Sequence, residues 1–228
     1  MTTTISGISS MATRLILGEL AQRYETAKGV KVAITSMGGV DAAKRVREGE
    51  ATDIVILASG PMGKLEAEGH LVAGSVRGFT RSGMAIAVRA GARRPDIGDE
   101  AAVKRAVLAA GKVCYSTGPS GDHLLQLCAK WGVPASSDKL LKAPPGVPVG
   151  SLVAKGEADL GFQQLSELIH VQGLEVLGPL PPEIQNVTVF AAGIASMSSQ
   201  PEQTADLIAY LAAPEAAEVK QAQGMEPA

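Results

Sequence analysis

The sequence predicts an α/β protein organised as two lobes. Short apolar segments rich in β-branched residues, which are typical of buried strands, alternate along the chain with segments of helical periodicity. This alternation favours a parallel sheet covered by helices. The 228 residues suit two lobes of similar size, each with this plan, better than one continuous sheet.

The first third of the chain contains three successive strand-to-helix units. Residues 2–8 are β-branched and alternating, Ser9 and Ser10 are suited to cap a helix, and apolar residues then recur at helical spacing to about Lys28. The segment KVAITSM predicts a second strand, which is followed by a helix through Glu48. The apolar run DIVILAS predicts a third strand, and the segment GPMGKLEAEGHL follows it.

The rest of the chain continues the alternation with shorter elements. A strand-like passage, MAIAVRA, precedes a loop rich in proline and glycine and a helix over residues 100–110. The segment KVCYST predicts a strand, and residues 120–131 predict a helix. After APPGVPVG come a helix at SLVAKGE, a strand at ADLGFQQ, the segment LEVLGPLP and a strand at NVTVFAAGIA. The tail from Pro201 predicts a final pair of helices, and no internal repeat interrupts the order.

The composition favours a small ligand over a polymer. A formal net charge of -2 and an aromatic content of 3% provide neither a basic stripe nor a set of stacking rings, which argues against nucleic acid as a partner. No apolar run approaches the ~20 residues of a membrane span. The N-terminus lacks the basic and apolar regions of a secretory signal. The sequence as it stands therefore predicts a cytoplasmic location, and a periplasmic one if a leader has been removed.

The cysteine and histidine residues do not predict a metal or cofactor site. Cys114 lies in a predicted buried strand and Cys128 in a predicted helix, without CxxC spacing, which favours core thiols. His70, His123 and His170 are isolated from one another and from the cysteines, so the sequence contains no zinc-ligand pattern. We therefore expect no metal and no cofactor.

Four loops between a predicted strand and a predicted helix carry small or hydroxyl residues. They are Ser9–Ser10, SMGGVD at residues 36–41, ASGPMG at 58–63 and YSTGPSGDH at 115–123. Glycine permits close backbone approach, and exposed N–H groups at the positive end of a helix dipole favour an anion. None of the loops matches a Walker A or a GxGxxG pattern, which disfavours nucleotide binding. Each loop taken alone is explained by ordinary turn and capping chemistry, and only their repetition at successive strand ends points to a ligand.

Several segments, in their order and spacing, resemble a known family over nearly the whole chain. They are GISSMAT, SMGGVDAAKRVREGEATDIVILAS, GPSGDHL, GSLVAKGEADLGF and LIAYLAAPEAAEVKQAQGME. Together they are similar to the periplasmic molybdate-binding proteins, a group of the type II periplasmic binding proteins. The resemblance implies a discontinuous first lobe at residues 1–81 and 189–228, a second lobe at 82–188 and a ligand cleft between the lobes. The crossing strands would fall near residues 80–85 and 185–191.

The resemblance also implies which residues hold the ligand. In the molybdate binders, a serine in each of the first two loops and a tyrosine after the GEAD segment are ligand donors. Ser10 matches the first serine, whereas Gly39 stands at the position of the second serine and Gln164 at that of the tyrosine. Because both departures remove a hydroxyl donor, we expect a small organic carboxylate to bind better than molybdate.

The predicted ligand-binding residues combine the strand-to-helix turns with one cation. Arg81, on a predicted crossing strand, is expected to make a bidentate contact with a carboxylate, and its alternative role is a solvated charge at a strand end. The other predicted lining residues are Ser9, Ser10, Gly38, Gly39, Ser59, Ser120, Gly121, Val147 and Gln164.

Two functions stay open from the sequence. The favoured one is a solute-binding protein that holds a small anion, an organic carboxylate or an oxyanion, and if exported passes it to an ABC transporter. The alternative is an enzyme on the same scaffold, because GFQQLSEL and GPLPPEIQ resemble relatives similar to aconitate isomerase, which shifts a double bond within a tricarboxylate. That chemistry needs a base, for which His123 and Glu167 are the candidates. No Ser-His-Asp spacing or paired-carboxylate signature accompanies them.

Overall fold

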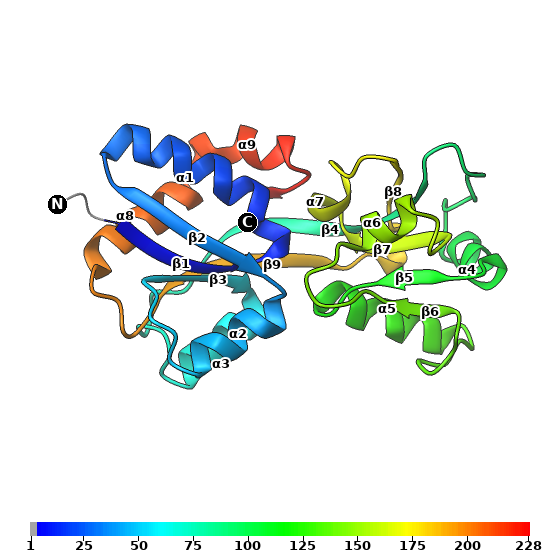
Figure 1. Ribbon diagram of the computed structural model, residues 1–228, viewed down its shortest axis with the longest axis horizontal. Coiled ribbons are helices and arrows are strands. Elements are labelled where there is room, and N and C mark those ends of the chain that lie inside the picture. The colour runs from blue at the N-terminus through cyan, green and yellow to red at the C-terminus, as the bar shows by residue number, and fades with distance from the viewer. Residues whose placement is uncertain (1–3) are drawn as a thin grey trace. The chain divides into compact units, whose positions relative to one another are not determined.

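The chain divides into two units in the computed structural model, which describes residues 4–228 (Figure 1). Unit 1 contains the chain up to Arg81 together with Thr188–Ala228, and unit 2 contains Ser82–Val187. The chain passes from one unit to the other within two strands, β4 (Arg77–Arg89) and β9 (Val187–Ile194). Thr2 and Thr3, at the start of the first predicted strand, lie outside the described residues.

Unit 1 is built on a mixed sheet with the strand order β2-β1-β3-β9-β4, and the short strand β10 also pairs with β4. The three strands β1, β2 and β3 run parallel to one another, as the alternating sequence predicts, and β9 runs antiparallel to β3. The remaining strands of unit 1 are β1 (Thr4–Ser10), β2 (Lys31–Met37), β3 (Ile54–Ala58) and β10 (Glu226–Pro227). Its helices are η1 (Met11–Thr13), α1 (Arg14–Lys28), α2 (Gly39–Arg47), α3 (Ser59–Ala67), α8 (Pro201–Ala212), η3 (Pro214–Ala216) and α9 (Ala217–Ala222).

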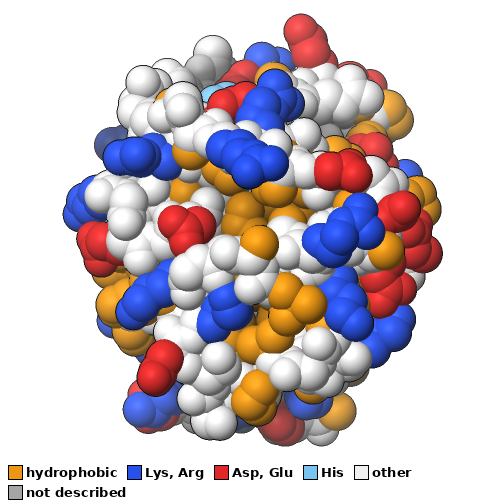
Figure 2. Space-filling model, turned by 90° about the vertical axis from the view of Figure 1, so that its right-hand side faces the viewer, with side chains coloured by type: hydrophobic (Ala, Val, Ile, Leu, Met, Phe, Trp, Pro, Cys, Tyr) orange, Lys and Arg blue, Asp and Glu red, His pale blue; other side chains and the backbone are white. Residues whose placement is uncertain are grey.

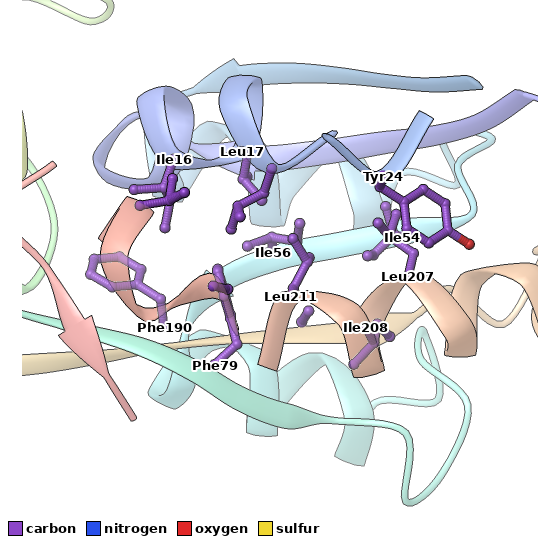
Figure 3. Packing of buried hydrophobic residues seen from close by; sticks show 14 of the residues in the cluster. Ile16, Leu17, Tyr24, Ile54, Ile56, Phe79, Phe190, Leu207, Ile208 and Leu211 are labelled. Atoms are coloured by element: carbon purple, nitrogen blue, oxygen red, sulfur yellow. The ribbon is translucent and has the colours of Figure 1, made fainter. Parts of the chain in front are cut away.

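Helices cover both faces of this sheet, which explains why β3 is apolar along its whole length. On one face, residues of α1 and α8 meet residues of β3, and Phe79 and Phe190 complete the cluster (Figure 3). On the other face, α2 and α3 contribute Val46 and Leu65 to a second buried cluster with Leu57 of β3. Burial of these side chains supplies the main stabilisation of the unit.

Unit 2 has the strand order β4-β7-β5-β6, and β8 pairs with β4. The strands β5, β6 and β7 are parallel, and β4 runs antiparallel to β7. Its strands other than β4 are β5 (Val113–Tyr115), β6 (Leu140–Lys142), β7 (Leu160–Gln164) and β8 (Leu174–Pro179). Its helices are α4 (Glu100–Ala109), α5 (Pro119–Lys130), α6 (Val149–Ala154), α7 (Leu165–Leu168) and η2 (Pro182–Ile184).

The core of unit 2 confirms the prediction for the two cysteines. Cys128 packs with Val103 of α4 and Phe162 of β7, and Cys114 packs with Val149 and Val153 of α6. Burial raises the pKa of both thiols to about 11, so they stay protonated as core residues. Within residues 4–228, no group of three or more His, Cys, Asp or Glu side chains is arranged to hold a metal ion. None of the helices in the same residues has the length and apolar character of a membrane span.

Candidate functional site

Three parallel strands of unit 1 end at one edge of the sheet, and a helical segment starts from each end. The strand β1 leads into η1 and α1, β2 leads through Gly38 into α2, and β3 leads directly into α3. The registers place Ser9 beside Ser36 of β2 and beside Ile56 of β3, so the three ends are level. The unpaired N–H groups of helix starts therefore gather along this edge, where they favour a negative charge.

The hydroxyl of Ser10 is the polar group at this edge that the fold leaves unsatisfied. Ser10 is 7% exposed, and its Oγ has no hydrogen-bond partner among the described residues. Its neighbour Ser9 is fully buried, and the Ser9 Oγ lies 2.8 Å from the Oγ of Ser36. Ser9 therefore holds β1 to β2, and Ser10 is the hydroxyl that can turn to a ligand. A buried polar atom without a partner is costly, which favours a ligand or a water there.

The glycines after β2 leave room beside Ser10. A Cβ at Gly39 would lie 3.8 Å from the Cβ of Ser10, which is an ordinary van der Waals contact. A serine side chain at position 39, in place of Gly39, could therefore be introduced without strain. Gly38 precedes α2 and lies close to Asp41 in the first turn of that helix. Ser59 begins α3, is exposed and donates its hydroxyl to the carbonyl of Val189 at 3.1 Å.

Arg81 has a partner within unit 1. Its Nε and Nη2 lie 2.9 and 2.8 Å from Oε2 of Glu226, the first residue of β10, and half of its side chain is exposed. β10 pairs with β4 at this position, which brings the two side chains together. The guanidinium is thus occupied by a surface ion pair, and the predicted contact of Arg81 with a ligand carboxylate stays a prediction.

Unit 2 has a corresponding edge, where β5, β6 and β7 end. The loop after β5 turns at Gly118, whose φ of +95° favours glycine, and leads into α5. Ser120, in the first turn of α5, is 3% exposed. A Cβ at Gly121 would lie 1.8 Å from the carbonyl oxygen of Ser116, so this position accepts only glycine. The close approach brings the first turn of α5 against the end of β5.

The other predicted lining residues of unit 2 lie at the ends of the next two strands. Val147 is half-buried in the loop between β6 and α6, and its N–H donates to the carbonyl of Pro144 at 3.0 Å. Gln164 is the last residue of β7, is 3% exposed and pairs in register with Met84 of β4. Ser120, Val147 and Gln164 thus follow three neighbouring parallel strands of one unit.

One ring nitrogen of His123 is engaged in a hydrogen bond and is not available to act as a base. It lies on α5, is half-buried, and its Nε2 is 2.8 Å from the carbonyl oxygen of Ile184. A carbonyl oxygen can only accept, so Nε2 carries the hydrogen in this contact and Nδ1 is the nitrogen left to accept a proton. The contact ties α5 to η2.

Glu167 lies in a polar cluster just after β7. The Nε2 of Gln163 donates to Oε1 of Glu167 at 2.7 Å. Burial raises the pKa of the Glu167 carboxyl to about 7, while the hydrogen bond from Gln163 acts in the opposite direction. Gln163 and Ser166 were not predicted as site residues. The unusual run of polar residues in QQLSE, between apolar neighbours, is the signal that could have indicated them.

The surface of unit 2 agrees with the low net charge of the sequence. On the face seen in Figure 2, the coloured Lys and Arg side chains are interspersed with Asp and Glu. Unit 2 also contains ion pairs between Arg94 and Glu175 and between Lys130 and Glu100. The coloured side chains of this face form no continuous basic area of the kind that binds nucleic acid.

Comparison with known proteins assigns the family. Residues 5–226 match the family model described as bacterial extracellular solute-binding protein. The chain belongs to this family. This solute-binding family member is 36% identical to the aconitate isomerase of a Pseudomonas species over 231 aligned residues. The alignment covers 99% of this chain and 88% of that protein.

Solved structures confirm the predicted fold of this solute-binding family member. The periplasmic molybdate-binding protein of Azotobacter vinelandii superposes with a TM-score of 0.79 at 18% identity, over 97% of this chain and 98% of that chain. The tungstate ABC transporter structure from Geobacter sulfurreducens superposes with a TM-score of 0.72 at 16% identity, over 95% and 97% of the two chains. The fold is therefore that of the two-lobed type II periplasmic binding proteins.

Proposed function

We propose that this protein binds a small organic anion at the strand edges from which its helices start. The observation that carries the proposal is the Ser10 hydroxyl, which is buried and has no partner within residues 4–228, where three helical segments of unit 1 begin. A hydroxyl and several backbone N–H groups form a neutral set of donors, which suits an anion whose charge need not be matched by a cation. The solute-binding family supports this function.

A carboxylate fits the donor set better than molybdate does. Gly39 and Gln164 stand where the molybdate binders carry hydroxyl groups, so a small tetrahedral dianion would lose two donors. A buried anion needs a full set of donors to replace its water. The remaining proposed ligand-binding residues are Ser9, Gly38, Ser59, Ser120, Gly121 and Val147. A contact of Arg81 with the anion is the alternative, which would require its guanidinium to leave Glu226. An ABC transporter partner and a location outside the cytoplasm are part of the same proposal. The family description supports the location, and similar structures of ABC transporter components support the partner.

Isothermal titration calorimetry tests this function. The probes are molybdate, tungstate, sulfate, succinate, citrate and both aconitates. We expect one of the carboxylates to bind, and we expect Ser10→Ala to weaken it at least tenfold, because a hydrogen bond to a charged group contributes roughly 1.5–3 kcal/mol. Ser136→Ala, which removes an exposed hydroxyl of unit 2, is the control. Binding that is equally tight in Ser10→Ala and wild type would contradict the proposed site, and no binding by any probe would contradict the proposed function.

Isomerisation of a small polycarboxylate is the second candidate. The 36% identity to an aconitate isomerase over almost the whole chain favours it. Such a reaction removes a proton from a methylene and returns one to the neighbouring allylic carbon, so it needs a group that can hold a proton near neutral pH. Glu167 has that property, and the contact of His123 with Ile184 engages only its Nε2. Incubation of cis- and trans-aconitate in D2O, followed by NMR, tests this candidate: interconversion with deuterium incorporation supports it, and unchanged substrates exclude it.

A further inference from the structure

Gln163, Ser166 and Glu167 of unit 2 form a polar cluster that the fold does not fully satisfy, and the Glu167 side chain in it is half-buried. Gln163 is 3% exposed and Ser166 is 5% exposed. Gln163 Oε1 and Ser166 Oγ have no hydrogen-bond partner among the described residues, although Gln163 Nε2 donates to Glu167. Such atoms are rare in folded proteins and indicate a bound water or a ligand.

The cluster lies at the end of β7, where Gln164 is a predicted ligand-binding residue. Gln163 and Gln164 are the last two residues of β7, and Ser166 and Glu167 lie in α7, which starts after Gln164. Gln163 and Gln164 are adjacent at this strand end, and Gln164 leads directly into α7. The hydrogen bond from Gln163 holds the carboxyl of Glu167 beside the same strand end.

The elements packed against α7 bring no counter-charge to Glu167. These elements are β7, α6 and β8, and β4 lies beside β7. β7 and α6 contain no titratable residue, and Glu175 of β8 is paired with Arg94 at 3.2 Å. In the unit 2 part of β4 the charged residue is Arg89, which lies beside Gly156. Neither Arg89, Glu175 nor His170, just beyond α7, contributes to the shift of the Glu167 pKa.

A carboxyl in this setting is suited to donate a hydrogen bond rather than to carry a charge. Oε1 of Glu167 accepts from Gln163, which leaves Oε2 to hold the proton. A neutral carboxylic acid can donate to a carboxylate, whereas an ionised one would repel it. The unpartnered Ser166 hydroxyl and Gln163 Oε1 add one further donor and one acceptor beside the acid.

We propose that Glu167, positioned by Gln163 and Ser166, donates a hydrogen bond to the bound anion, so that the anion is taken up together with a proton. This inference rests on the proposed anion-binding function, because the linkage exists only when an anion binds. The shift of the Glu167 pKa to about 7 supports it, since the ligand-free carboxyl then exchanges its proton at the pH where binding is measured.

Calorimetry in paired buffers measures the proton. Succinate, trans-aconitate and molybdate serve as probes between pH 7 and 9, where their own groups stay ionised. Each titration is run in HEPES and in Tris, whose different ionisation enthalpies report the number of protons taken up. With a free carboxyl pKa of about 7, we expect uptake of about 0.5 proton at pH 7 and about 0.9 at pH 8. The affinity should fall by up to tenfold for each further pH unit.

Three variants separate the roles in the cluster. Glu167→Gln keeps the size and a donor, and should bind with no proton uptake and with an affinity independent of pH. Gln163→Met removes the hydrogen bond that lowers the Glu167 pKa, so the uptake profile should move to higher pH. Glu157→Gln, an exposed residue of the same unit, should match the wild type. Circular dichroism of each variant shows whether it is folded.

The outcomes distinguish the inference from the function. Binding of a probe with less than 0.1 proton taken up at pH 8 would overturn the inference and leave the binding function intact. Uptake that persists in Glu167→Gln would assign the proton to another group and would also overturn it. Absence of binding by all three probes in the wild type would overturn both.

Discussion

The two strand edges share one architecture but differ in chemistry. In both units three parallel strands end together and a helix starts from each. At the edge of unit 1 the unsatisfied group is the Ser10 hydroxyl, which does not change its charge between pH 4 and 9. At the edge of unit 2 the unsatisfied groups surround Glu167, whose carboxyl titrates near neutral pH. The two edges therefore share a scaffold but differ in their response to pH, which comes from the side chains after the strands.

The glycines at the two edges also differ, and this difference gives the largest expected effect. A Cβ at Gly39 of unit 1 would make only an ordinary contact with the Cβ of Ser10 at 3.8 Å, whereas at Gly121 of unit 2 the Ser116 carbonyl oxygen lies 1.8 Å from that position. Gly121→Ala must push α5 away from β5, and we expect it to lower the free energy of unfolding by ~4 kcal/mol or to prevent folding. Urea unfolding measures this, with Gly39→Ala as the matched control. Equal stability of the two variants would break the comparison.

The carboxyl of Glu167 predicts a pH-dependent stability that unit 1 does not share. Its pKa is near 4.5 in the unfolded chain and about 7 in the folded protein. The folded state therefore holds the proton more tightly, and its contribution to stability, fully present below pH 4.5, is lost as the pH rises to 7. Glu167→Gln should abolish this loss. Between pH 4 and a pH above 7, the difference in free energy of unfolding between variant and wild type should therefore change in favour of the variant by up to about 3 kcal/mol.

Thermal or urea unfolding of both proteins between pH 4 and 9 measures the difference. A Glu157→Gln variant, with the carboxylate removed from an exposed position, should follow the wild type at each pH. Parallel profiles for wild type and Glu167→Gln would show that the carboxyl is solvated in the folded protein, and the contrast between the two edges would disappear.

A serine at position 39 tests the edge of unit 1, as the Glu167 variant tests the edge of unit 2. Gly39→Ser places a side chain where a Cβ meets only the Cβ of Ser10, at 3.8 Å, so the stability should change by less than about 1 kcal/mol. A second hydroxyl at this edge should strengthen molybdate binding by about tenfold, since one decade of affinity is ~1.4 kcal/mol. Gly39→Ala separates the hydroxyl from the added volume. A gain in Gly39→Ala as large as that in Gly39→Ser would show that the hydroxyl is not a ligand donor.

The sequence predicted the parts of this molecule that local patterns control. The strand-to-helix order of β1–α1, β2–α2 and β3–α3 follows from apolar periodicity and from turn residues, and the predicted α/β fold is confirmed. The bounds of α4 and α5 agree with the predicted ranges 100–110 and 120–131 to within one residue, whereas α6 begins two residues and ends three residues before the predicted segment SLVAKGE. Ser10 precedes η1 but makes no side-chain capping bond, unlike Asp99 at the start of α4. Helix α7 and strand β10, with four and two residues, are too short to produce a periodic signal.

The side-chain partnerships at the two edges depend on tertiary contacts, so the sequence could not specify them. Ser10 and Ser9 are adjacent hydroxyls with the same local pattern, and only the register with β2 shows that Ser9 is bound to Ser36 while Ser10 is not. The burial that raises the pKa of Glu167 arises from the packing of α7 on β7 and β8. Which of the predicted residues touch a ligand stays a prediction.

Arg81 gives the smallest expected effect and tests whether the anion depends on a cation at all. The sequence predicted it as the decisive charge contact, but in unit 1 its guanidinium pairs with Glu226 and is half exposed. Exposed ion pairs contribute ~0–1 kcal/mol, so Arg81→Ala should change stability by less than 1 kcal/mol. If the neutral donors at the strand edges hold the anion, affinity should fall less than threefold in Arg81→Ala, measured by calorimetry with the tightest-binding carboxylate. Glu226→Gln, which frees the guanidinium, is the companion variant and should leave affinity unchanged. A loss of tenfold or more in Arg81→Ala, with a gain in Glu226→Gln, would show that Arg81 exchanges Glu226 for the ligand and would return the charge contact to the site.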